Sequence, residues 1–258
     1  MIADRIHLEI SGKADGPALI VHHALGACVD MWNPQLTVLE PHFRVIRIDM
    51  RGHGKSRAPQ PPYSIEDLAD DVVQVMDEMA IAKSHYLGLS IGGMVGQALA
   101  LNHPGRLERL VISNTVSRVP VEMHGMWDER VAAVQDGGME SQVAMTLARW
   151  FTEDYAKDHQ DVLDWIAGMV RNTTPDGFIG CCQAIKGLDL TDRLSQITAP
   201  CLIIAGAQDQ GTPPEKAREI HQRVAGSRLH IIEDAAHLSN VQASEEFNDL
   251  ILPFLLEG

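Results

Sequence analysis

The chain has 258 residues, of which 45% are hydrophobic and 22% are charged, so a single large domain can bury a full core. Its formal net charge of −14 disfavours binding to nucleic acid and to anionic membranes, although a local arginine could still hold a small anionic substrate. The four cysteines have no regular spacing, and no apolar run suits a signal peptide or a membrane span. We therefore expect a cytoplasmic protein without disulfides, zinc, or nucleic-acid and membrane partners, and the sequence leaves open whether it is a monomer or a homo-oligomer.

Short apolar runs alternate with longer amphipathic segments, which is typical of a mostly parallel sheet covered by helices. The pattern predicts strands at residues 6–10, 18–22, 43–49, 85–89, 110–113, 201–205 and 229–232. It predicts helices at residues 64–80, 92–102, 213–224 and 244–255. The expected fold class is therefore α/β.

One stretch, from about residue 120 to residue 196, contains no convincing strand. Several helical patterns follow one another there, and strand signals resume only at Cys201. The simplest interpretation is a helical insertion between two core strands that forms a cap, or lid, over a pocket. We expect a core made of residues 1–118 and 198–258 and a cap made of residues 119–197.

The clearest chemical signal is Gly88-Leu89-Ser90-Ile91-Gly92, which stands between an apolar run and a helical pattern. A nucleophilic serine on a sharp strand-to-helix turn needs this context, because small residues on either side let the backbone pass closely. The helix that follows also points amide N–H groups at any oxyanion formed there. The motif alone could be a glycine-rich turn, so its partners decide the interpretation.

A serine nucleophile needs a base, and the base needs an acid that orients it. His237 follows the last expected strand, and Asp209 follows the strand before it, so both should lie at the carboxyl edge of the sheet. The strand that ends at Asn114 offers no carboxylate, and Asp234 lies too close to His237 in sequence to be the better choice. We therefore predict that Ser90 is the nucleophile, His237 the base and Asp209 the acid.

An oxyanion hole should complete the site. We expect one donor to be the backbone N–H of Ile91 and the other to be that of Ala24, in the loop after the strand at residues 18–22. The adjacent His22 and His23 could suggest a metal, but neighbouring strand residues point apart and no carboxylate or thiol is near them in sequence, so we expect no metal. Residues 51–56 lack the spacing of a phosphate loop and are interpreted as a tight turn.

With these motifs in place, the chain resembles the α/β-hydrolase superfamily over nearly its whole length and, within it, the 3-oxoadipate enol-lactonases of aromatic catabolism. The matching segments are residues 25–26, 31–36, 42–45, 49–56, 62–68, 88–97, 110–115, 126–130, 149–152, 180–184, 236–240 and 247–248. The cap segments among them are the most specific. His22-His23-Ala24 departs from the small polar residues that the family usually has before the early Leu-Gly.

The resemblance implies the α/β-hydrolase fold and a serine hydrolase that cleaves a small lactone or carboxylic ester through an acyl-enzyme, without a cofactor. It points to 3-oxoadipate enol-lactone hydrolysis in the β-ketoadipate pathway. A carboxylated lactone would need a cation in the cap. The expected substrate contacts are Leu25, the arginines Arg130 and Arg149, and the apolar walls Trp127 and Trp150.

Three alternatives stay open at this point. The first is a general carboxylesterase or perhydrolase-like enzyme with the same triad, and the second is a C–C bond hydrolase, which the cap segments disfavour. The third is a non-catalytic hydrolase-like binding protein, which the presence of Ser90, Asp209 and His237 in order argues against. Epoxide hydrolases and haloalkane dehalogenases would carry aspartate at position 90.

Overall fold

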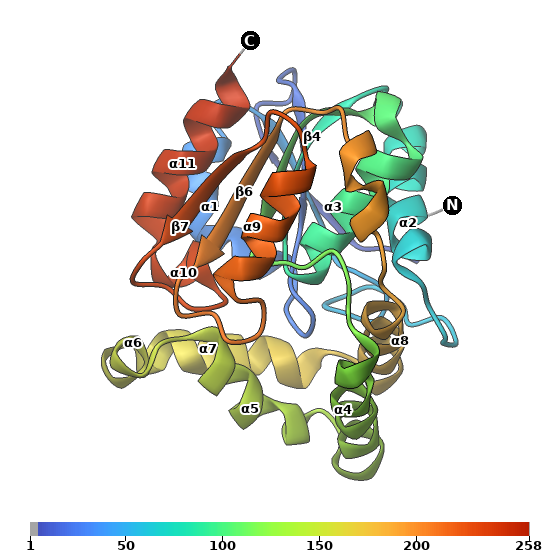
Figure 1. Ribbon diagram of the computed structural model, residues 1–258, viewed down its shortest axis with the longest axis vertical. Coiled ribbons are helices and arrows are strands. Elements are labelled where there is room, and N and C mark those ends of the chain that lie inside the picture. The colour runs from blue at the N-terminus through green and yellow to red at the C-terminus, as the bar shows by residue number, and fades with distance from the viewer. Residues whose placement is uncertain (1–4, 258) are drawn as a thin grey trace.

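The computed structural model describes residues 5–257, and its centre is a seven-stranded sheet in the order β1-β3-β2-β4-β5-β6-β7 (Figure 1). The strand bounds are β1 Leu8–Gly12, β2 Ala18–His22, β3 Arg44–Ile48, β4 Ser84–Leu89, β5 Leu107–Ser113, β6 Cys201–Gly206 and β7 Arg228–Ile232. Only the β1–β3 pair is antiparallel, and the five other pairs of neighbours are parallel. The expected α/β sheet is thus present, although β1 and β5 are shifted by two or three residues from their expected starts.

Helices cover both faces of the sheet, because the central strands bury both faces in two separate apolar clusters. One cluster joins alternate strand residues such as Ile20 and Tyr86 to the helices α2 (Ile65–Glu78), α3 (Ile91–Asn102) and α9 (Pro214–Arg223). The other joins the intervening residues, such as Val21 and Leu87, to α1 (Asn33–Leu39) and α11 (Ser244–Leu256). The alternation follows from the two-residue period of a strand.

The helix ends follow local chemistry. Ser64 caps α2 by accepting a hydrogen bond from the Asp67 N–H, and the Asp67 carboxylate accepts one from the Ser64 N–H, which is a complete capping box. The sequence pattern did not identify the short helices α1 and α10 (Ser239–Gln242) or the 3-10 turns at Val29–Trp32, Pro104–Arg106, Val121–Met123 and Thr191–Gln196. Within residues 5–257, no helix combines the length and apolar character needed to cross a membrane.

The stretch without strands forms five helices between β5 and β6: α4 (His124–Gly137), α5 (Glu140–Trp150), α6 (Glu153–Asp158), α7 (Gln160–Asn172) and α8 (Pro175–Lys186). They form a separate layer beyond one end of the sheet (Figure 1). Backbone contacts join the two ends of this insertion. Arg118 and Asp189 form an isolated antiparallel β-bridge, and the Val119 N–H donates to the Leu188 carbonyl. The insertion starts from the carboxyl end of β5, so it covers the edge where sites of parallel sheets form.

Candidate active site

Ser90 lies on a sharp turn between β4 and α3, with φ 59° and ψ −118°, a conformation that is strained for a residue other than glycine. The flanking glycines make this turn possible. A Cβ atom at Gly88 would lie 2.3 Å from the Gly92 carbonyl oxygen, and one at Gly92 would lie 2.3 Å from the His22 carbonyl oxygen. The Gly-x-Ser-x-Gly pattern is therefore a steric requirement of the turn, as the sequence predicts.

The backbone of the turn is fixed while the side chain of Ser90 stays available. The Ser90 N–H donates to the Ser113 carbonyl, and the Thr115 hydroxyl donates to the Ser90 carbonyl at 2.8 Å. In the described part of the chain, the Ser90 hydroxyl has no hydrogen-bond partner, and Ser90 lines the same pocket as His237. A nucleophile–base hydrogen bond that forms only with substrate bound is common in free enzymes.

His237 and Asp209 lie together as predicted, since His237 Nδ1 is 2.7 Å from Asp209 Oδ2 and both side chains are buried. The rival Asp234 is exposed. Burial opposes ionisation of Asp209, but the charge and hydrogen bond of His237 and further hydrogen bonds outweigh it and lower the pKa of Asp209 to about 2. The carboxylate is therefore ionised at neutral pH and can fix the tautomer of the imidazole.

Three residues that hold Asp209 were not identified from the sequence. Thr212 donates to it twice, from its N–H at 2.9 Å and from its hydroxyl at 2.6 Å, and the Gly211 N–H donates at 2.8 Å. Asn114 donates from Nδ2 at 3.0 Å and has a positive φ of 47° at the end of β5. Asparagine tolerates this conformation better than most residues, so an asparagine directly after a strand was the available signal.

The expected oxyanion loop lies against the N-terminus of α3, where Ile91 is the first helical residue. Ala24 is completely buried, and Leu25 rather than Ala24 lines the pocket. The roles of Ile91 and Ala24 stay predictions, and Leu25 is a second candidate for the loop donor.

The histidines before this loop are engaged in buried contacts. His22 Nδ1 is 3.0 Å from the Tyr86 hydroxyl, and His23 Nδ1 is 2.8 Å from the Ala24 carbonyl oxygen. Burial lowers the pKa of His22 well below its usual value and that of His23 to about 4. Across residues 5–257, no group of three or more histidine, cysteine, aspartate or glutamate side chains is arranged to hold a metal ion.

A cavity of about 340 Å³ between the core and the insertion opens onto Ser90 and His237. All five expected substrate contacts line it: Leu25, Trp127, Arg130, Arg149 and Trp150. Arg118 and Lys216, which were not identified from the sequence, line it as well. None of its described lining residues is an aspartate or glutamate, so the pocket is locally basic in a chain of net charge −14.

The two cap arginines differ in their surroundings. The Arg130 guanidinium lies 5.2 Å from the Trp127 ring centroid and 5.1 Å from that of Phe178, and its Nε donates to Gln142 at 3.1 Å. Burial and the neighbouring Arg149 charge lower the pKa of Arg130. Arg149 extends to Gly211, where an added Cβ atom would lie 3.0 Å from Arg149 Nη2. Neither guanidinium forms an ion pair with a carboxylate of the described residues.

A family model described as the α/β hydrolase fold matches residues 17–244. The chain belongs to the α/β-hydrolase family. The insertion between β5 and β6 is therefore consistent with the cap of an α/β hydrolase, and the expectation of this fold is confirmed.

Relatives of this hydrolase are similar to it over nearly the full length. The 3-oxoadipate enol-lactonase 2 of Acinetobacter baylyi is 32% identical over 240 residues, 93% of this chain and 89% of the relative. The putative carbamate hydrolase RutD of Caulobacter sp. strain K31 is also 32% identical, over 98% of this chain and 96% of its own.

Solved structures give the same result. The enol-lactonase from Burkholderia xenovorans LB400 superimposes with a TM-score of 0.94 at 37% identity, over 98% of this chain and 96% of its own. A malate-bound thermophilic esterase from Thermogutta terrifontis has a TM-score of 0.91 at 26% identity, over 97% and 92%. This α/β hydrolase thus resembles enzymes named for different small substrates, and its own pocket must indicate which substrate it takes.

Proposed function

We propose that this α/β hydrolase opens a small lactone that carries a carboxylate, with 3-oxoadipate enol-lactone as the best candidate. The observation that carries the proposal is the pocket lining: Arg118, Arg130 and Arg149 line a cavity next to Ser90 that has no acidic lining residue, whereas the fourth cation, Lys216, is paired with Glu219. Buried or half-buried guanidinium groups without carboxylate partners attract an anionic ligand strongly, because hydrogen bonds to charged groups are the strong ones.

The chemistry proposed for the site is acyl transfer. His237, oriented by Asp209 at 2.7 Å, takes the proton of Ser90 as the Ser90 oxygen attacks the lactone carbonyl. The Ile91 N–H and an N–H of the loop at residues 24–25 stabilise the tetrahedral oxyanion. The ring C–O bond then breaks, and protonated His237 gives its proton to the released enol oxygen, which stays on the acyl chain and becomes a ketone. Water, activated by His237, releases the acid and regenerates Ser90.

The similarity to enol-lactonases from two bacteria supports this substrate class, and the malate bound to the Thermogutta terrifontis esterase is itself a dicarboxylate. The alternative is a general esterase that acts on neutral esters. The apolar part of the lining, which includes Met94, Met126 and Trp150, suits such substrates as well. The two possibilities differ in whether a substrate carboxylate raises kcat/KM.

The test compares hydrolysis of 3-oxoadipate enol-lactone, followed by ultraviolet absorbance, with hydrolysis of p-nitrophenyl acetate. The proposal predicts fast turnover of the lactone, and Ser90→Ala should abolish turnover of both substrates. Turnover of the ester without turnover of the lactone would leave the triad in place and make the protein a general esterase. Undiminished turnover by the Ser90→Ala variant would exclude Ser90 as the nucleophile.

A further inference from the structure

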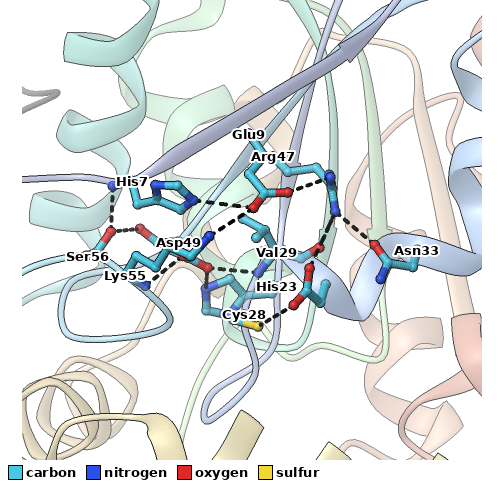
Figure 2. Close-up of polar contacts among 11 residues, drawn as sticks. His7, Glu9, His23, Cys28, Val29, Asn33, Arg47, Asp49, Lys55 and Ser56 are labelled. Atoms are coloured by element: carbon cyan, nitrogen blue, oxygen red, sulfur yellow. Dashed lines mark hydrogen bonds and ion pairs between the residues drawn. The ribbon is translucent and has the colours of Figure 1, made fainter. Parts of the chain in front are cut away.

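His23 lies at the base of the expected oxyanion loop and connects two segments of backbone. Its Nδ1 lies 2.8 Å from the Ala24 carbonyl oxygen, and its Nε2 lies 3.0 Å from the Met50 nitrogen. The side chain is completely buried, and Figure 2 shows it beside Asp49 at the end of β3. The sequence pattern assigns no role to this histidine once a metal is disfavoured.

These two contacts fix the tautomer of His23. The Met50 N–H can only donate, so Nε2 must be the unprotonated nitrogen that accepts. The proton of the neutral ring is then on Nδ1, and Nδ1–H donates to the Ala24 carbonyl. The pKa of about 4, which burial imposes on His23, keeps the ring neutral around pH 7.

The Ala24 carbonyl is held from a second side as well, because the Ala27 N–H donates to it at 3.0 Å. In a trans peptide the carbonyl oxygen and the next N–H point in opposite directions. With the Ala24 oxygen fixed toward the buried His23 ring, the Leu25 N–H must point away from that ring. Leu25 lines the pocket that contains Ser90, so a Leu25 N–H that points away from His23 is available to a ligand in this pocket.

The Ala24 N–H is a poorer candidate for the donor, because it faces the wrong way. A Cβ atom at Gly92 would lie 2.9 Å from the His23 carbonyl oxygen, so this carbonyl faces the N-terminal turn of α3. The Ala24 N–H, on the opposite side of that peptide, points away from the Ser90 turn. Ala24 also has no exposed surface, whereas Leu25 has some.

We propose that His23 is a positioning residue that holds the Ala24–Leu25 peptide so that the Leu25 N–H, together with the Ile91 N–H, receives the oxyanion. This inference rests on the proposed acyl-transfer function of Ser90 but not on the identity of the lactone. An oxyanion donor must point at the position of the charge before the reaction, so the orientation of this peptide affects the transition state more than substrate binding.

Asp49 forms a hydrogen bond with the other end of the same loop, at Val29. Its Oδ1 accepts from the Val29 N–H at 2.8 Å and its Oδ2 from the Lys55 N–H at 3.0 Å, as Figure 2 shows. A Cβ atom at Gly54 would overlap the Asp49 carboxylate, and Gly54 has a φ of +51°. The turn at residues 51–56, which the sequence predicts to be structural, thus holds Asp49 in place. Asp49 and Met50 in turn bind the two ends of the oxyanion loop, at Val29 and at His23.

Two substitutions separate the two contacts of His23. In His23→Asn, the amide Nδ2 stands where Nδ1 is and can still donate to the Ala24 carbonyl, while the Met50 N–H loses its acceptor. In His23→Gln, the longer side chain reaches the Nε2 position and can accept from the Met50 N–H, while the bond to the Ala24 carbonyl is lost. His85→Gln is the matched control, because His85 is a buried histidine at the start of β4 and has no contact with the loop.

Steady-state hydrolysis of p-nitrophenyl acetate by the folded variants tests the proposal. We expect His23→Gln to lower kcat at least tenfold with KM changed less than threefold, and His23→Asn to stay within threefold of the wild type in kcat. The melting temperature should show the opposite order, with His23→Asn lower than His23→Gln. His85→Gln should leave kcat unchanged. Equal losses of kcat in the Asn and Gln variants, or no loss in either, would overturn the proposal.

A second measurement does not depend on turnover. Trifluoromethyl ketones add to an active-site serine and place an oxyanion in the same position. The Kd of an aryl trifluoromethyl ketone should rise in His23→Gln by the same factor as kcat falls, and should change less than threefold in His23→Asn. An unchanged Kd in His23→Gln would refute the role of His23. A wild type that turns over the ester but not the lactone would refute only the proposed substrate.

Discussion

Replacing Arg130 by methionine tests whether the cap binds a substrate carboxylate. The guanidinium has one polar partner of the described residues, the neutral amide of Gln142, and two aromatic neighbours, Trp127 and Phe178. Methionine keeps much of the apolar volume between the two rings and removes only the charge and the donors. The substitution therefore isolates the anion contact from the packing.

The size of the effect follows from the contact that would be lost. A hydrogen bond to a charged group contributes about 1.5–3 kcal/mol, and each 1.4 kcal/mol corresponds to a factor of ten. We expect kcat/KM for 3-oxoadipate enol-lactone to fall by about 10- to 150-fold in Arg130→Met. Turnover of p-nitrophenyl acetate should change less than about threefold, because this ester carries no carboxylate.

The free energy of unfolding of Arg130→Met gives an independent test of whether Arg130 is kept for binding an anion. Burial lowers the pKa of Arg130 and no acidic side chain lines its pocket, so the folded protein keeps this cation at a cost. Urea unfolding of Arg130→Met should therefore show a stability equal to or higher than that of the wild type. Arg218→Met, at an exposed position of α9 outside the pocket lining, is the control and should leave the lactone kcat/KM unchanged. An unchanged ratio of lactone to ester turnover in Arg130→Met would show that Arg130 does not bind a substrate carboxylate.

Three further predictions concern the triad and the turn. Thr212→Val removes the hydroxyl that donates to Asp209 at 2.6 Å but keeps the backbone N–H, so kcat should fall by about tenfold or less, measured with either substrate. The pKa of Asp209 is about 2 in the folded state, below its ordinary value of 3.8. Ionised Asp209 therefore stabilises the fold by roughly 2 kcal/mol above about pH 4, and this contribution is lost as the pH falls toward 2. The free energy of unfolding of the wild type minus that of Asp209→Asn, followed by urea titration from pH 7 to pH 2, should decrease over this window, and a constant difference would contradict the assignment. Gly92→Ala should destabilise the protein by about 3 kcal/mol or more in thermal melting, because its Cβ would lie 2.3 Å from a backbone oxygen. The control Gly168→Ala, where α7 has open space, should be neutral or stabilising.

The order of strands and helices could be predicted because apolar runs and amphipathic segments alternate clearly along the core of the chain. The buried strands β2 and β6 begin at the expected residues, since continuous apolar runs bounded by turns mark them clearly. The end strand β1 and the start of β5 were less well predicted. Their burial is partial or mixed with exposed residues, so the apolar pattern is weaker there.

The partners of the triad could be predicted only in part. Position after a strand predicted that His237 and Asp209 lie close together, as they do in the structure at 2.7 Å, because parallel strands bring their carboxyl ends to one edge. It could not identify Asn114 and Thr212 as donors to Asp209, since hydrogen bonds across 95 residues of chain, or within one irregular loop, leave no periodic signal. The same limit applies to the loop donor, because the sequence does not show which way the peptide groups on either side of Ala24 face.

A pair of substrates that differ in one charge distinguishes an enzyme for anionic lactones from a general esterase. The measurement is kcat/KM of the wild type for 3-oxoadipate enol-lactone and for the methyl ester of its free carboxylate, with lactone opening followed in both cases. A pocket that binds the carboxylate through its arginines predicts that the free acid is the better substrate by at least tenfold. Equal values, or a preference for the neutral methyl ester, would contradict an enzyme specific for an anionic lactone and indicate a general esterase.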